Sequence, residues 1–177
     1  MNVDYKRLDK LAISIYIDYS LNSFPIDVFD LAKRMGIKVL KYSAFEGEMQ
    51  ELLLKRSNDG FYSPSPNGPL IFYNDLINNE FKIRMTIAHE IKHYVCQDTE
   101  EDNELFEKEA KHFARYLLCP IPYLIFKNIL SVFEIMDTFG LSNEAATNAL
   151  SNVNNRTNRY GDRIFYYEKP LLELLKK

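Results

Sequence analysis

The strongest constraint on the fold is a predicted helix from Asn79 to Val95 whose apolar surface is too wide for a helix that faces solvent. The apolar side chains in it are Phe81, Ile83, Met85, Ile87, Ala88, Ile91, Tyr94 and Val95. Together they would cover most of the circumference of a helix, and a helix that is apolar nearly all round has to be buried. We therefore predict a central helix that the rest of the chain encloses.

The size and composition of the chain suit such a core. Its 177 residues are 46% hydrophobic and show no repeat or linker, so we expect a single domain over residues 1–177. Acidic residues interrupt every apolar run near the N-terminus, no window is apolar enough to cross a membrane, and two cysteines make no disulfide framework. We expect a cytoplasmic protein without membrane contact.

Shorter elements are expected on both sides of the central helix. Helical patterns cover residues 3–21, a short segment through Ala32, and residues 104–118, 121–139 and 142–152. Strand patterns occur at residues 37–39, 52–54, 61–62 and 70–74. The acidic segment 97–104 is expected to be a solvated loop. The predicted fold is α+β, a mostly helical domain with a small, largely antiparallel three-stranded sheet near the central helix.

The central helix carries the sequence His-Glu-Ile-Lys-His at residues 89–93. His89 and His93 are four residues apart, so their rings project from the same face and can bind one zinc ion. Glu90 is one step round the helix, where a base could act on a water that the metal activates. The alternative is two hydrogen-bonded core histidines, but burying two imidazoles and a carboxylate without a metal would be costly.

A catalytic zinc site needs a third protein ligand and an open position. The next predicted helix offers Glu104, Glu107, Glu109 and His112. Glu107 and Glu109 flank its apolar side on opposite sides, and helical geometry alone does not choose between them. Most of these glutamates are expected to be solvated surface charges.

Several segments together resemble the ImmA/IrrE family of bacterial zinc metallopeptidases, which are gluzincin-like. The segments are RMTIAHEIKHYV, EKEAKHFARYLLCP, PIDVFDLAKRMGIKV, PLIFYN and FGLSNEAATNAL, and the resemblance covers roughly residues 20–150. Met85, Lys92 and Cys119 stand where the family more often has Phe, Gly and Met. None of these departures touches an expected ligand.

The resemblance assigns roles by position. His89 and His93 match the zinc-binding histidines, Glu90 the catalytic glutamate, and Glu109 the third ligand, with Glu107 held as the alternative. The implied function is a zinc endopeptidase that cleaves a helix-turn-helix transcriptional repressor and so derepresses genes of a prophage, another mobile element or a stress response. Manganese or iron could occupy the same ligands. Tyr94, Tyr116 and His112 are available as oxyanion donors, and none is preferred.

Two other functions compete with the peptidase. Residues 131–152 form a predicted helical hairpin that could be a DNA-binding helix-turn-helix. Its second helix has Glu144 and no Lys or Arg, and the chain's net charge is −3, so we expect no direct nucleic-acid binding. A non-catalytic zinc regulatory module is the other alternative, but a purely structural zinc site would not need Glu90.

Overall fold

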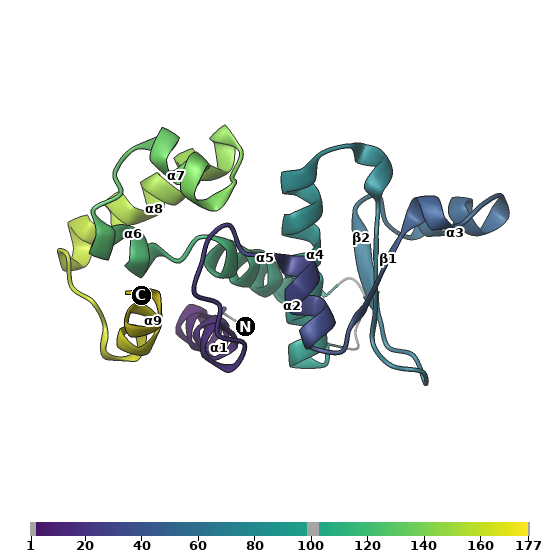
Figure 1. Ribbon diagram of the computed structural model, residues 1–177, viewed down its shortest axis with the longest axis horizontal. Helices are drawn as coiled ribbons and strands as arrows, with labels where there is room; N and C mark the ends of the chain where they lie inside the picture. The colour runs from purple at the N-terminus through teal and green to yellow at the C-terminus, as the bar shows by residue number, and fades with distance from the viewer. Residues whose placement is uncertain (1–2, 99–102, 177) are drawn as a thin grey trace. The chain divides into compact units, whose positions relative to one another are not determined.

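The computed structural model describes residues 3–98 and 103–176 (Figure 1). It separates into two compact units that are described one at a time. The sheet unit contains Asp27–Ala114, and the helical unit contains Asp4–Ile26 and Arg115–Lys177. The single domain expected over residues 1–177 stays a prediction.

The sheet unit contains a three-stranded sheet with the strand order β1-β3-β2, formed by β1 (Lys38–Lys41), β2 (Gly60–Ser63) and β3 (Leu70–Tyr73). The strands β2 and β3 are antiparallel and joined by a short loop, whereas β1 and β3 are parallel. The α+β class and the three strands are confirmed, but the expected largely antiparallel pairing is wrong, because the sheet is mixed. The chain between β1 and β3 is long enough to act as a crossover that returns β3 in the same direction as β1.

The strand expected at residues 52–54 is a helix instead. These leucines lie in α3 (Glu48–Arg56), where Leu53 is buried and Leu52 is exposed. A short apolar run fits a strand or a helix equally well. The charges decide for a helix, because two glutamates lie in the first turn and Lys55 and Arg56 in the last, where each sign is favourable.

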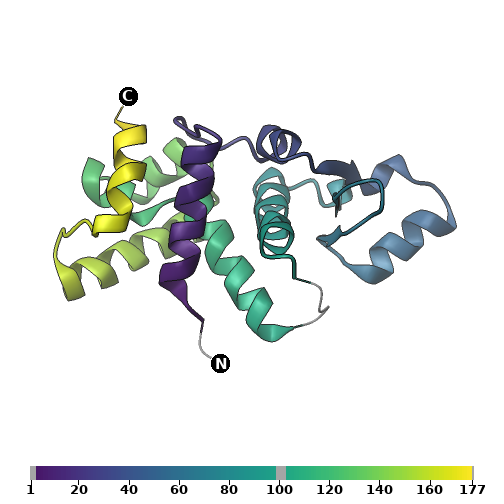
Figure 2. The same ribbon diagram turned by 90° about the horizontal axis from the view of Figure 1, so that it is seen from below.

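The predicted central helix is α4 (Glu80–Cys96), and its burial is confirmed. It contacts β2, β3 and the short helix α2 (Val28–Arg34). The side chain of Asn79 accepts a hydrogen bond from the backbone N–H of Lys82 and so caps the start of α4. Figures 1 and 2 show α3 on the side of the sheet away from α4. The next helix, α5 (Glu104–Leu118), begins in the sheet unit.

The helical unit consists mostly of short helices. They are α1 (Tyr5–Asp18), α6 (Ile121–Lys127), α7 (Val132–Phe139), α8 (Asn143–Tyr160) and α9 (Lys169–Leu175). The single helix expected over residues 121–139 is two helices, because Asn128 adopts a left-handed conformation (φ 55°) that ends α6. Ser142 caps α8, as expected, but α8 continues beyond residue 152.

Contacts between distant parts of the sequence hold the helical unit together. The hydroxyl of Tyr16 in α1 donates a 2.6 Å hydrogen bond to the carbonyl of Leu117. The ring of Phe24 packs on the rings of Tyr123 and Phe139. Figure 2 shows α1 and α9 side by side, in agreement with their contacts.

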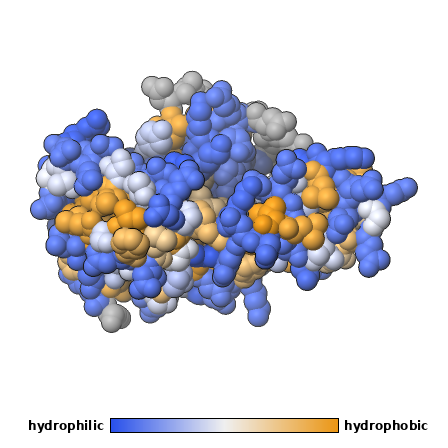
Figure 3. All heavy atoms as spheres, turned by 90° about the horizontal axis from the view of Figure 1, so that it is seen from above, coloured by the Kyte–Doolittle hydropathy of each residue, from blue (hydrophilic) through white to orange (hydrophobic). Residues whose placement is uncertain are grey.

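The surface of the helical unit carries apolar side chains, which gather in patches in the view of Figure 3. The large exposed ones include Phe126, Leu130 and Phe133. Among the described residues, no helix combines the length and apolar character needed to cross a lipid bilayer.

Gly60, at the start of β2, lies where the sheet and α4 come closest. A Cβ added there would be 2.5 Å from the backbone oxygen of Phe72 and 2.7 Å from the Thr86 methyl carbon in α4. Both distances are shorter than real Cβ contacts, and a backbone oxygen in a sheet cannot turn away. Glycine is therefore required here for space.

We predict that Gly60→Ala destabilises the protein by about 1–3 kcal/mol, because the added methyl group forces β2 away from its neighbours. Urea denaturation of the variant and the wild type measures the difference. Ser63→Ala, at the other end of β2, is the control and should change stability by less than about 0.5 kcal/mol. Equal stability of Gly60→Ala and the wild type would show that the strand can move freely at this point.

Candidate metal centre

The two histidines of α4 lie one helical turn apart and form one side of a polar cluster. The ring centroids of His89 and His93 are 5.0 Å apart, and both side chains are largely buried. The spacing follows from the helix, because residues at i and i+4 project from the same face. The close placement inferred from the sequence is therefore present.

The helix α5 brings a carboxylate to both rings. Oε2 of Glu107 lies 3.2 Å from Nε2 of His89, and Oε1 lies 3.3 Å from Nε2 of His93. Asn103 caps this end of α5 by accepting a hydrogen bond from the backbone N–H of Leu105. Glu107 is therefore held in the first turn of a capped helix.

The donor atoms of His89, His93 and Glu107 all lie within 4.8 Å of one another. Two ligand atoms at about 2.0–2.1 Å from a tetrahedral zinc ion lie about 3.3–3.4 Å apart. The nitrogen–oxygen distances of 3.2 and 3.3 Å match that spacing. Two imidazoles and one carboxylate are also a donor set typical of catalytic zinc. The residues present therefore fit a divalent metal ion.

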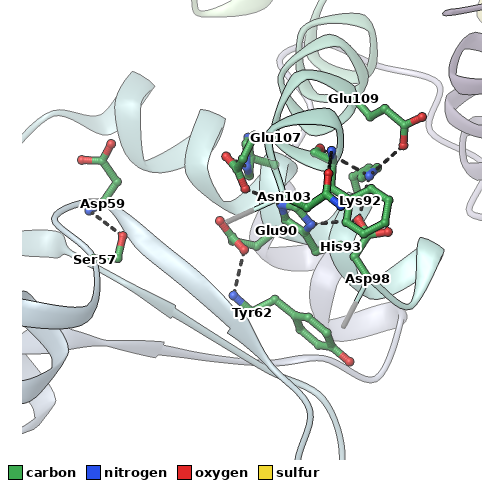
Figure 4. Close-up of polar contacts among 12 residues, drawn as sticks. Ser57, Asp59, Tyr62, Glu90, Lys92, His93, Asp98, Asn103, Glu107 and Glu109 are labelled. Carbon is green, nitrogen blue, oxygen red and sulfur yellow. Dashed lines mark hydrogen bonds and ion pairs between the residues drawn. The ribbon is translucent and has the colours of Figure 1, made fainter. Parts of the chain in front are cut away.

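Glu90 lies beside this group and not within it. Its side chain is buried, and Oε2 accepts a 2.8 Å hydrogen bond from the backbone N–H of Tyr62 in β2 (Figure 4). Burial raises the pKa of Glu90 to about 8; the Tyr62 N–H lowers the pKa, and the charge of Glu107 raises it. A carboxyl group with a pKa near neutrality can take up and release protons under ordinary conditions.

The environment of His89 lowers its pKa, whereas that of Glu90 raises the pKa. Burial lowers the pKa of His89 to about 4, although the neighbouring Glu107 carboxylate raises it. The imidazole is therefore neutral at pH 7, and a neutral imidazole is the form that binds a metal ion.

Nε2 of His93 lies near Glu107, and the second ring nitrogen, Nδ1, has a different partner. Nδ1 lies 2.9 Å from Oδ2 of Asp98, which also accepts a 2.6 Å hydrogen bond from Nζ of Lys92. The Asp98 side chain is only 7% exposed, so the expectation of a solvated acidic loop is wrong for this residue. Residues 99–102 of that segment lie outside the described residues. A carboxylate on the second nitrogen of a histidine is a common support of metal ligands.

Glu109, expected as the third ligand from the family pattern, lies elsewhere. Its Oε2 is 3.0 Å from Nζ of Lys92, and Figure 4 shows its carboxylate across Lys92 from Glu107. The structure therefore brings Glu107, the alternative, to the two histidines. Glu107 and Glu109 are two residues apart on one helix, so they cannot both point to the same place.

Of the three candidate oxyanion donors, Tyr94 lies in α4, whereas His112 and Tyr116 lie in α5. The Tyr94 ring packs edge-on against the Tyr62 ring, with centroids 5.9 Å apart. Tyr116 is a buried residue of the helical unit, and burial raises the pKa of its hydroxyl well above the usual value. His112 is half-buried in α5. The contacts described for Tyr94, Tyr116 and His112 do not single out one of them as an oxyanion donor.

The contacts made by Lys92, Asp98 and the Tyr62 N–H are not predicted from the sequence. A signal for the first two was available, because a lysine inside an otherwise apolar helix needs acidic partners when the helix is buried. The hydrogen bond from Tyr62 depends on how β2 lies against α4, which the local pattern does not contain.

Comparison with known families gives one result. Residues 32–151 match the profile of the IrrE N-terminal-like domain, a peptidase family. The matched region contains His89, Glu90, His93 and Glu107. A search of curated proteins found no match.

The raised pKa of Glu90 predicts a pH-dependent stability of the metal-free protein. The folded state keeps this proton up to about pH 8, whereas an unfolded chain loses it near pH 4.5, so its stabilising effect disappears as pH rises through 8. The lowered pKa of His89 makes the folded state more stable as pH rises, and this gain in stability is complete above about pH 6.5. Between pH 6.5 and 8, the free energy of unfolding of the wild type should therefore fall by about 1–2 kcal/mol more than that of Glu90→Gln.

Urea denaturation in the presence of a chelator at pH 6.5 and 8.0 measures this difference. Other groups titrate equally in the two proteins, so the comparison isolates Glu90. The same pH dependence in both proteins would show that Glu90 ionises at its ordinary pKa.

Proposed function

The chain belongs to the IrrE N-terminal-like family and is of the metallopeptidase type, and from this premise we propose that it is a cytoplasmic zinc-dependent endopeptidase. We assign the metal to His89, His93 and Glu107, with Glu107 in place of the expected Glu109. The observation that carries the proposal is the convergence of these three side chains from α4 and α5. Glu90 beside them is the proposed catalytic residue.

The metal, when bound, supplies a Lewis acid that activates water and polarises the peptide carbonyl. Glu90 accepts the proton of the attacking water and delivers it to the leaving nitrogen as the peptide bond breaks. The Tyr62 N–H holds Oε2 of Glu90, so we assign the proton transfer to Oε1. The ionised form that a base requires would be favoured by the positive charge of a metal ion held by the neighbouring histidines.

We further propose that the substrate is a helix-turn-helix transcriptional repressor, whose cleavage derepresses genes of a mobile element or of a stress response. The support is the resemblance to ImmA/IrrE metallopeptidases in the segments around α4, α5 and α8. Co-expression with a helix-turn-helix regulator encoded beside this chain tests the assignment. An intact regulator under inducing conditions would contradict it.

The DNA-binding alternative finds little support in the geometry of α7 and α8. The N-terminal part of α8 carries Glu144 and no cation. The guanidinium of Arg156 forms two hydrogen bonds to Glu168, at 2.6 and 2.7 Å, so this cation is engaged within the helical unit. A non-catalytic zinc module would not need Glu90, so the peptidase remains our proposal.

We predict that Glu90→Gln binds as much zinc as the wild type and cleaves substrate at least about 100-fold more slowly, because general base catalysis is lost. Zinc content by elemental analysis and cleavage by gel electrophoresis give the two readouts. Cleavage at the wild-type rate would remove Glu90 from the mechanism.

A second prediction concerns the third ligand. Glu107→Gln should lower zinc affinity at least about tenfold, since even the loss of a group that supports a ligand often costs 10- to 100-fold. Competition with a chromophoric chelator measures the affinity. Glu104→Gln is the matched control, because this exposed carboxylate lies one turn earlier on α5, and it should bind zinc like the wild type. Unchanged affinity of Glu107→Gln would exclude the assignment.

A further inference from the structure

Lys92 is fully buried although it lies on the helix that carries the proposed metal ligands. Its side chain has 0% exposure, and its place between His89 and His93 in the sequence puts it within one turn of both. Burying an ammonium group is very unfavourable unless it is paired and hydrogen-bonded. Such a residue therefore needs a structural or functional reason.

Three oxygen atoms surround the ammonium group of Lys92. Nζ lies 2.6 Å from Oδ2 of Asp98, 3.0 Å from Oε2 of Glu109 and 3.4 Å from the carbonyl oxygen of Phe106. An ammonium group has three N–H donors, and three acceptors surround this one. The ring of Phe106 adds a cation–π contact at 5.0 Å. These acceptors come from two places, the segment after α4 and the helix α5.

One oxygen connects Lys92 to His93. Oδ2 of Asp98 lies 2.6 Å from Nζ of Lys92 and 2.9 Å from Nδ1 of His93 (Figure 4). An ionised carboxylate is only an acceptor, so Nδ1 of His93 carries a proton and donates a hydrogen bond to Asp98. The proton on Nδ1 leaves Nε2 as the nitrogen with a lone pair, and Nε2 is the atom 3.3 Å from Glu107.

We propose that Lys92 is a positioning residue for the metal centre. Its ammonium holds Asp98 against Nδ1 of His93, and this fixes both the ring orientation and the tautomer that presents Nε2 to the metal. Its contact with Glu109 ties α5 to α4 and so keeps Glu107 in place. The inference rests on the proposed function, since it concerns the same metal site.

The variant Glu109→Gln offers a background in which to test the role of Lys92. Lys92→Met alone would leave two buried carboxylates, Asp98 and Glu109, without their shared cation and could prevent folding. In Glu109→Gln, one carboxylate is already neutral, and Lys92 keeps its contact with Asp98. Comparing Glu109→Gln with Lys92→Met/Glu109→Gln therefore isolates the contact between Lys92 and Asp98.

We expect the double variant to bind zinc at least tenfold more weakly than Glu109→Gln, measured by chelator competition on folded protein. The visible spectrum of the Co²⁺-loaded protein is the second readout. It should change between the two variants, because a reoriented His93 alters the ligand field; a role in stability alone would lower the melting temperature and leave the spectrum unchanged. Should the methionine variant not fold, Lys92→Gln in the same background gives the same comparison.

Three results would overturn the inference, and they differ from one another. Equal zinc affinity and equal Co²⁺ spectra in the two variants would show that Lys92 does not position His93. Loss of zinc from Glu109→Gln, together with unchanged zinc affinity of Glu107→Gln, would make Glu109 the ligand, as the family pattern implies. A wild-type protein that binds no zinc would remove the proposed function itself.

Discussion

The burial of α4 is the constraint on which the site depends. This helix packs against the sheet and α2 with its apolar side chains, yet it also carries Glu90 and Lys92 into the interior. Water cannot solvate these groups there, so each requires a partner from another element. The N–H of Tyr62 in β2 serves Glu90, and carboxylates before and within α5 serve Lys92. The surrounding elements are therefore arranged by the polar groups as well as by the apolar ones.

The same burial sets the acid–base properties of the site. It raises the pKa of Glu90 and lowers the pKa of His89, because in each case the charged form is the one that loses hydration. A neutral imidazole and a carboxyl group near its titration point are the forms that metal binding and proton transfer require. One physical effect thus sets the protonation of the proposed ligand His89 and of the proposed base Glu90, which are adjacent on one helix.

The parts of this account that could be predicted from the sequence are those with a local pattern. The apolar residues between 79 and 95 predict α4. The four-residue spacing of His89 and His93 predicts that their rings lie on one face of this helix. The direction of β1 relative to β3 depends on how the chain returns after a crossover, which no local pattern contains. Which of Glu107 and Glu109 faces the histidines depends on how α5 is turned about its axis, and in the tertiary fold Glu109 is turned toward Lys92.

We propose that side chains from two helices, α4 and α5, bind one metal ion. Anomalous diffraction at the zinc absorption edge, from crystals of the zinc-loaded wild type, measures this directly. We expect a single strong peak about 2.0–2.2 Å from Nε2 of His89, Nε2 of His93 and a carboxylate oxygen of Glu107. A peak beside Glu109 instead, or no peak at the histidines, would contradict it.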